Sequence, residues 1–92
     1  MCYLYLIRCA ETSYYKIGIA DSPNDRLVAL QLGCPYVLSI ILTCALISRS
    51  AAQRAESEMH NNLAHFNVHT EWFDLSEEQI AVIKHNMILC GE

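Results

Sequence analysis

Two short runs near the start of the chain, Tyr3-Leu4-Tyr5-Leu6-Ile7 and Tyr14-Tyr15-Lys16-Ile17-Gly18-Ile19, decide the fold. Both are rich in aromatic and β-branched residues, which favour strands. The group Ala10-Glu11-Thr12-Ser13 between them is polar, as is typical of a loop. The sequence therefore predicts a β-hairpin at the N-terminus.

The register of this hairpin follows from the length of its loop. If Cys9 pairs with Tyr14 across the four-residue loop, Tyr5 lies opposite Gly18. Because side chains alternate between the two faces of a strand, Tyr5 and Lys16 then share one face. We therefore expect a phenol and an ammonium group to be neighbours on the hairpin.

Three helices are predicted after the hairpin. The first is capped by Ser22, has Pro23 at its first position and runs to Leu32. The second begins near Ser50, and the third follows the capping box Ser76-Glu77-Glu78-Gln79. Apolar residues recur at intervals of three or four in the last two segments: Ala52, Ala55, Met59, Leu63 and Phe66 in the second helix, and Ile80, Ile83 and Met87 in the third.

Two further segments have strand character, Tyr36 to Cys44 and the short aromatic run Glu71 to Leu75. The resulting order β-β-α-β-α-(β)-α predicts an α/β (α+β) fold with a small, mostly antiparallel, three-stranded central sheet flanked by helices. With 92 residues, of which 53% are hydrophobic, and with no linker composition, the chain is expected to form one domain over residues 1–92.

Charge and composition restrict the function classes. The net charge is −4, but residues 1–54 carry +2 and residues 55–92 carry −6, so a basic front could meet phosphate. The longest apolar stretch, residues 37–47, is too short for a membrane span. Five cysteines without a C-x-x-C pair or an export signal favour a cytoplasmic protein with reduced thiols. We expect no membrane partner.

The hairpin resembles the N-terminal motifs of the GIY-YIG nuclease superfamily. Tyr3-Leu4-Tyr5 corresponds to its first motif and Lys16-Ile17-Gly18 to its second, with eleven positions separating Tyr5 from Lys16. Arg26 follows Lys16 by ten positions, as the arginine of that superfamily does. The resemblance implies a GIY-YIG-like fold for one domain.

The second half of the chain resembles one branch of that superfamily, the phage T5 open reading frame 172 and Mug113-type domains. Glu56 and His60 are similar to its E-x-x-x-H signature, and Glu71-Trp72-Phe73 to its G-E-W-F signature. The resemblance covers roughly Tyr3 to Leu75. It implies a divalent-metal-dependent endonuclease that hydrolyses phosphodiester bonds in nucleic acid, with DNA as the expected substrate.

The resemblance also implies roles for individual side chains. Tyr5, Lys16, Arg26 and His60 are the candidate catalytic residues, and Glu56 is the candidate ligand of one Mg²⁺ or Mn²⁺ ion. A cation at Lys16 is expected to lower the pKa of Tyr5 and make it a better base toward water. Arg26 can bind phosphate oxygens with two parallel hydrogen bonds. A purely structural role for His60 remains an equal alternative.

Further residues are candidates for contact with nucleic acid or for support of the site. Arg8, Lys16 and Arg26 are expected to bind nucleic acid. Tyr15, Asn67 and Glu71 are candidate supporting residues, although Asn67 is equally explained as a turn residue. A zinc cluster of His60, His65 and His69 is disfavoured, because the spacing matches no common zinc motif.

Alternative functions remain open from the sequence. Thr70 and Tyr3 stand where relatives have glycine, which makes activity less secure than fold. One alternative is an inactive DNA-binding domain with the same fold. Another is a homomeric interaction module that pairs through residues 37–44 or the last helix. A homodimer or a larger partner protein could also supply substrate specificity, since no separate DNA-binding domain is seen.

Overall fold

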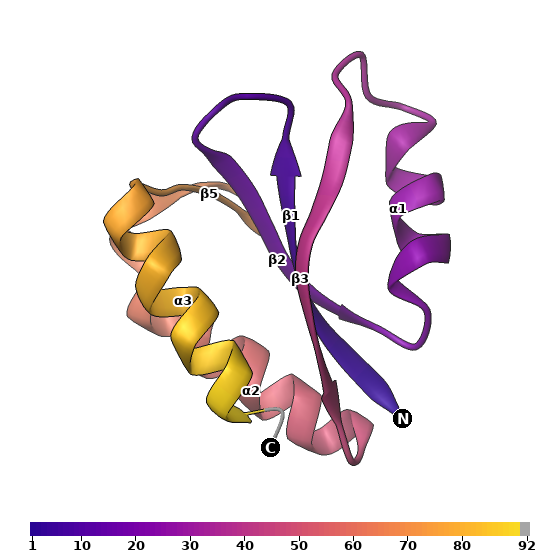
Figure 1. Ribbon diagram of the computed structural model, residues 1–92, viewed down its shortest axis with the longest axis vertical. Coiled ribbons are helices and arrows are strands. Elements are labelled where there is room, and N and C mark those ends of the chain that lie inside the picture. The colour runs from indigo at the N-terminus through magenta and orange to yellow at the C-terminus, as the bar shows by residue number, and fades with distance from the viewer. Residues whose placement is uncertain (91–92) are drawn as a thin grey trace.

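The N-terminal hairpin forms the centre of the observed sheet. The structure, a computed structural model, describes residues 1–90. All strand pairs in it are antiparallel, in the order β3-β1-β2-β5-β4. The elements are β1 (Cys2–Cys9), β2 (Tyr14–Ala20), α1 (Pro23–Gln31), β3 (Leu38–Leu46), α2 (Arg49–Asn62), η1 (Ala64–Phe66), β4 (Asn67–His69), β5 (Trp72–Asp74) and α3 (Glu77–Cys90). Helix α1 covers one face of the sheet, and α2 and α3 cover the other (Figure 1).

The predicted hairpin register is confirmed. Tyr5 pairs with Gly18 and Ile7 with Lys16. Tyr5 and Lys16 therefore lie on the same face of the sheet, the one covered by α1. This register brings the glycine of one strand directly beside the tyrosine of the other.

The predicted helix starts are confirmed for α1 and α3. The hydroxyl of Ser22 accepts a hydrogen bond from the backbone N–H of Asp25, and Pro23 is the first residue of α1. Ser76 and Gln79 form the reciprocal capping box, with distances of 3.2 and 2.8 Å. Within residues 1–90, no helix combines the length and the apolar content needed to cross a membrane.

Helix α2 differs slightly from the prediction at both ends. It begins at Arg49 because the hydroxyl of Ser48 caps it by accepting from Ala51 N–H. It ends at Asn62, so Phe66 lies in the following 3₁₀ turn and is 39% exposed. The placement of Phe66 on the buried face of α2 was therefore wrong, because the helix stops one turn earlier.

The sheet has five strands in the described part of the chain, where the sequence predicts three and a short fourth. Strand β3 lies two residues later than expected, over Leu38–Leu46. The aromatic run contains β5, which pairs with the preceding strand β4 in a hairpin. Strand β4 is only Asn67–His69 and is exposed throughout, so it has no apolar alternation from which it could have been predicted.

The β4–β5 turn contains a strained residue. Thr70 has φ of 51°, in the left-handed region that β-branched residues rarely adopt. The turn is held by the amide of Asn67, which donates to the carbonyls of Thr70 and Trp72 at 2.8 and 3.1 Å. Asn67 is thus a turn residue, as the structural alternative proposed.

Two apolar clusters lie on opposite faces of the sheet. The larger cluster packs α2 and α3 against Leu4, Leu6, Ile17 and other buried residues. The smaller cluster packs α1 against Tyr5, Ile7 and Leu38. Since no residue of α1 itself is fully buried, this helix is attached mainly through the partly buried Leu27 and Leu30.

The strain at Thr70 yields a prediction about stability. A non-glycine residue in the left-handed region destabilises the fold by about 1–2 kcal/mol, and replacing it with glycine removes this strain. The greater backbone entropy of glycine in the unfolded chain offsets about 0.5–1 kcal/mol of the stability gained. We expect Thr70→Gly to raise the free energy of unfolding by about 0.5–1 kcal/mol in urea denaturation. The matched control is Thr43→Gly on the exposed side of β3, which should lower it, because glycine weakens a strand. If Thr70→Gly lowered the free energy of unfolding as much as Thr43→Gly does, Thr70 would not be strained in the native structure.

Candidate active site

Five side chains predicted to act in function converge at one end of β2. Tyr5 comes from β1, Lys16 from β2, Arg26 from α1, Glu56 from α2 and Glu71 from the β4–β5 turn. The ladder between β5 and β2 extends only from Tyr14 to Lys16. Beyond Lys16, β5 no longer covers the outer edge of β2. Groups from both faces of the sheet can therefore meet around this edge.

Gly18 is the backbone position on which the convergence depends. A Cβ atom built at Gly18 would lie 2.7 Å from Cζ of Tyr5 and 3.1 Å from Oε2 of Glu71. The buried tyrosine ring, only 1% exposed, thus occupies the space that a side chain at this position would need. Because both the Tyr5 hydroxyl and the Glu71 carboxylate lie next to Gly18, the two groups are close to each other.

The buried Lys16 forms an ion pair with Glu71, whose side chain is 37% exposed. Its Nζ atom lies 2.8 Å from Glu71 Oε2, and Lys16 is 5% exposed. The Trp72 ring lies beside the same ammonium group, with its centroid 5.9 Å from Nζ. Lys16 therefore holds the carboxylate of Glu71 in place.

The pKa of Tyr5 is raised, not lowered as expected, and Lys16 is not among the groups that shift it. Burial raises the pKa of Tyr5 above 10.0, and the charges of Glu71 and Glu56 raise it further. Arg26 opposes this, because its guanidinium group donates toward the Tyr5 oxygen and carries positive charge. Tyr5 is therefore a protonated phenol at neutral pH, and Arg26 is the cation that interacts with it.

Glu56 and Glu71 form a pair of carboxyl groups. Burial first, and then the charge of Glu71, raise the pKa of Glu56 above 4.5, whereas His60 and Lys16 lower it. The two groups are close enough for a hydrogen bond, which requires that one of them keeps a proton. Two carboxylates that repel each other in a partly buried position favour a cation between them.

This donor set fits Mg²⁺ or Mn²⁺ held by few protein ligands. Among residues 1–90, no group of three or more His, Cys, Asp or Glu side chains is arranged to enclose a metal ion. Mg²⁺ commonly binds through one or two carboxylates and keeps several waters, so Glu56 and Glu71 are the residues that would hold it. A closed zinc site needs four ligands, and the three histidines first considered for one do not form such a group.

His60 lies one helical turn after Glu56 and contacts the outer edge of β2. Its Nε2 atom is 2.8 Å from the carbonyl oxygen of Ile17. Because a carbonyl can only accept, Nε2 carries the hydrogen, and Nδ1 is the remaining proton acceptor of the neutral ring. The ring also packs on Phe73 at a centroid distance of 5.1 Å. His60 thus has a structural contact and still borders Glu56.

Two predicted residues lie on the other face of the sheet. Tyr15 is buried there, and the Arg8 guanidinium lies 5.7 Å from the centre of its ring. Arg8 also donates from Nε to the carbonyl of Thr12 at 2.9 Å. The structure therefore does not bring Arg8 and Tyr15 together with Tyr5, whose strand neighbour on the same face is Ile7.

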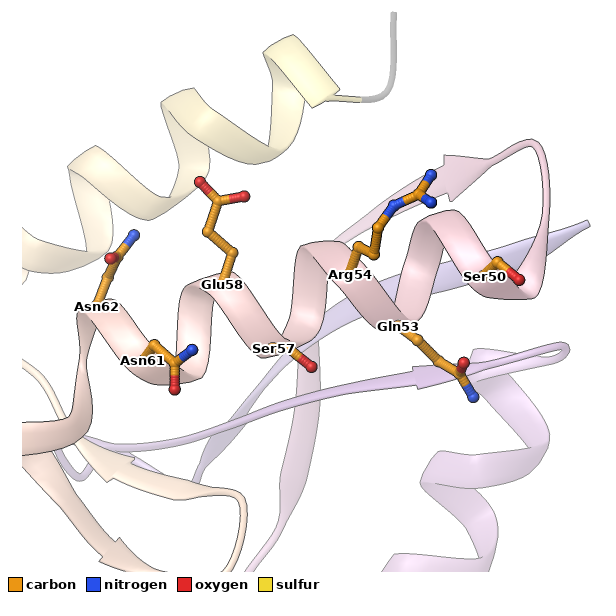
Figure 2. Close-up of a pocket in the computed structure, with 7 residues that line it drawn as sticks. All are labelled: Ser50, Gln53, Arg54, Ser57, Glu58, Asn61 and Asn62. Carbon is orange, nitrogen blue, oxygen red and sulfur yellow. The ribbon is translucent and has the colours of Figure 1, made fainter.

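One hollow in the described surface lies apart from this cluster. It is lined only by α2, through Ser50, Gln53, Arg54, Ser57, Glu58, Asn61 and Asn62 (Figure 2). Its polar side chains follow the outer side of one helix and include none of the five converging residues. This hollow therefore supplies matched control positions on α2, such as Glu58 for Glu56.

Sequence reasoning gave no role to Gly18 or to Trp72. Gly18 was named only as the last residue of the second motif. The predicted register already paired it with Tyr5, and this pairing could have indicated that the position needs a glycine. Trp72 was named only as part of the Glu71-Trp72-Phe73 signature, and in the structure it is partly buried and lies against Lys16. Its position depends on the β4–β5 hairpin, which the sequence did not reveal.

The close approach at Gly18 predicts an asymmetry between two glycines. Gly18→Ala should lower the free energy of unfolding by about 1–3 kcal/mol, because the new methyl group overlaps the Tyr5 ring. Gly33→Ala is the matched control, since nothing lies within 4 Å of a Cβ there and its φ is not positive. It should be neutral or slightly stabilising in urea denaturation. Equal losses in both variants would contradict the packing of Tyr5 on Gly18.

One of three comparisons with known proteins gave a match. A comparison with curated proteins and another with solved structures gave no match. The sequence model of the T5orf172 domain matches residues 2–87, which spans β1 to most of α3 and includes all five converging residues. T5orf172 domains are a nuclease-like family. This chain belongs to the T5orf172 domain family.

Proposed function

We propose that the protein is a divalent-metal-dependent endonuclease that hydrolyses phosphodiester bonds, with DNA as its substrate. The observation that carries the proposal is the convergence of Tyr5, Arg26, Glu56 and Glu71 around Gly18, from elements far apart in the chain. A phenol, a guanidinium group and a carboxyl pair are the chemical groups that phosphodiester hydrolysis needs. Membership of a nuclease-like family supports the same reaction class.

Arg26 binds the scissile phosphate in this proposal. It lies in the first turn of α1, and its side chain reaches toward the Tyr5 hydroxyl while the residue as a whole is exposed. Its planar guanidinium group can donate to two phosphate oxygens at once and can stabilise the negative charge that develops on them. The same cation lowers the cost of removing the proton from Tyr5.

Tyr5 orients the attacking water and, once it has released its own proton to solvent, accepts a proton from that water as the oxygen–phosphorus bond forms. A phenol whose pKa is raised by burial and by two carboxylates is a poor base in the free protein. Positive charge bound at Glu56 and Glu71 would cancel the second of these two causes. Tyr5 therefore becomes a competent base only when the carboxyl pair is neutralised. His60 interacts with Glu56 and has a free acceptor in Nδ1, which supports a role for it in carrying a proton away from the site.

Glu56 is the residue proposed to hold a single Mg²⁺ or Mn²⁺ ion, with Glu71 beside it. When bound, such an ion supplies charge stabilisation for the phosphate and for the leaving oxygen. Lys16 acts indirectly, because its ion pair fixes the Glu71 carboxylate at 2.8 Å from Nζ. Lys16 is thus a positioning residue in this mechanism.

Plasmid nicking tests the proposal. With Mg²⁺ or Mn²⁺, the purified protein should nick supercoiled DNA, and Glu56→Gln and Tyr5→Phe should each reduce the rate by at least about 100-fold. Glu58→Gln and Tyr36→Phe are the matched controls, because both residues are exposed and neither borders the cluster. Their rates should equal that of the parent protein.

The outcomes separate the proposal from its rivals. Equal cleavage by all four variants would trace the activity to a contaminant. DNA binding without cleavage at any metal concentration would instead establish an inactive DNA-binding domain. A protein that neither binds nor cleaves DNA but forms a dimer in light scattering would favour the interaction module.

The carboxyl pair predicts opposite pH effects on stability and on metal binding. Because the pKa of Glu56 is raised in the folded state, its stabilising contribution is complete below 4.5 and is lost as the pH rises through the raised value. Mn²⁺ affinity should rise over that same interval, since the ion competes with the proton. Paramagnetic relaxation and urea denaturation measure the two effects.

Glu56→Gln provides the control for this pH dependence. This variant should bind Mn²⁺ weakly at every pH and should lack the loss of stability above pH 4.5. Glu58→Gln should keep the pH-dependent Mn²⁺ affinity and the loss of stability above pH 4.5. A parent protein whose Mn²⁺ affinity is constant above pH 4.5 would show that Glu56 is not the carboxyl group that competes with the metal.

A further inference from the structure

An apolar groove lies on the same face of the sheet as Tyr5 and Lys16. One wall is the end of α1 and the loop after it, including Leu30 and Cys34, and the other wall is the β4–β5 hairpin. Tyr14 and Leu38 complete the lining. None of its lining residues is an Asp, Glu, Lys or Arg. The groove therefore suits an uncharged group.

The groove adjoins the candidate active site through Trp72. Trp72 lines the groove and lies 5.9 Å from the Lys16 ammonium group, which is paired with Glu71. Tyr14 is two residues from Lys16 on the same face of β2, which corresponds to about 7 Å along a strand. A nucleotide next to a phosphate held at Arg26 and Tyr5 is thus within reach of the groove.

The aromatic lining identifies the chemistry of the occupant. Tyr14 is 44% exposed, His69 is exposed and Trp72 is partly exposed, so all three can present ring surface to a ligand. Flat, uncharged and aromatic groups stack on such rings, and nucleobases are the groups of this kind that a nuclease substrate carries. Because the chain has a net charge of −4, attraction to phosphate alone gives it little affinity for nucleic acid. Stacking supplies a contribution that salt does not screen.

We propose that this groove binds an unstacked nucleobase next to the scissile phosphodiester. The proposal rests on the proposed nuclease function and narrows its substrate class. A base inside a regular duplex is stacked on both sides and cannot enter a groove. The preferred substrate is therefore nucleic acid with an unpaired base, such as a single strand, a mismatch or a bulge.

Binding is tested apart from cleavage. The Glu56→Gln protein in EDTA is titrated into a fluorescently labelled 16-nucleotide DNA strand and, separately, into its duplex, and anisotropy is recorded. The single strand should bind about 10-fold more tightly than the duplex. Adding Tyr14→Ser or His69→Ala should weaken single-strand binding by about 5- to 50-fold, also at high salt, and leave duplex binding unchanged. Tyr36→Ser, at an exposed tyrosine outside the groove, should change neither.

Photo-crosslinking tests the location. A strand with 5-iododeoxyuridine, irradiated in the complex, should crosslink to peptides that contain Tyr14, His69 or Trp72. Crosslinks confined to other peptides, or unchanged affinity in Tyr14→Ser and His69→Ala, would overturn the groove assignment. A dimer that Tyr14→Ser dissociates without any change in strand binding would overturn it too and would identify a second copy as the occupant.

The two proposals fail in different ways. If the parent protein nicks plasmid but the groove variants bind and cleave as it does, only the nucleobase site is wrong. If single-strand binding depends on Tyr14 and His69 but no metal supports cleavage, the groove assignment stands and the nuclease activity fails.

Discussion

A lysine that is almost completely shielded from water requires a counter-charge, and the position of Glu71 follows from that requirement. Lys16 is 5% exposed and lies on the central hairpin, so the nearest flexible segment must bring a carboxylate to it. The β4–β5 turn does so, with Trp72 beside the ammonium group. Removing one partner of such a pair leaves a charge uncompensated, which costs more than the pair itself contributes. The ion pair thus fixes one side of the candidate site, and Gly18 leaves room for Tyr5 on the other.

Most of the fold could be predicted because its signals are local. The hairpin register followed from the loop length, and the starts of α1 and α3 from Ser22 and the Ser76 capping box. Strand β4 could not be predicted, because its residues are exposed and its partner β5 is defined only after folding. Phe66 was misplaced because periodicity indicates which face a residue occupies and says little about where a helix ends.

The sequence predicted which residues meet in the candidate site, but it did not predict the direction in which the pKa of Tyr5 is shifted. Motif spacing identified Tyr5, Arg26 and Glu56, which meet in the structure. The pKa of Tyr5 depends on burial and on two carboxylates brought in from α2 and the β4–β5 turn, which sequence spacing does not reveal. Arg8 and Tyr15 were assigned by residue type, but strand alternation turns both to the opposite face. Side-chain alternation applied to Arg8 would have shown this.

The β4–β5 hairpin is joined to the rest of the sheet by few contacts, although it carries both Glu71 and Trp72. Its strand pairing with β2 covers Tyr14–Lys16, and one further backbone hydrogen bond runs from Ile17 N–H to the carbonyl of Glu71 at 3.2 Å. All residues of β4 are exposed. Segments of this kind open locally at a lower free energy than the whole domain. The exposed part of this rim of the site, strand β4 and the turn that follows it, can therefore detach while Phe73 of β5 stays in the core beneath α2 and α3. A ligand that contacts this rim must offset the entropy of ordering it, so occupancy of the site and protection of the hairpin amides from hydrogen exchange are thermodynamically linked.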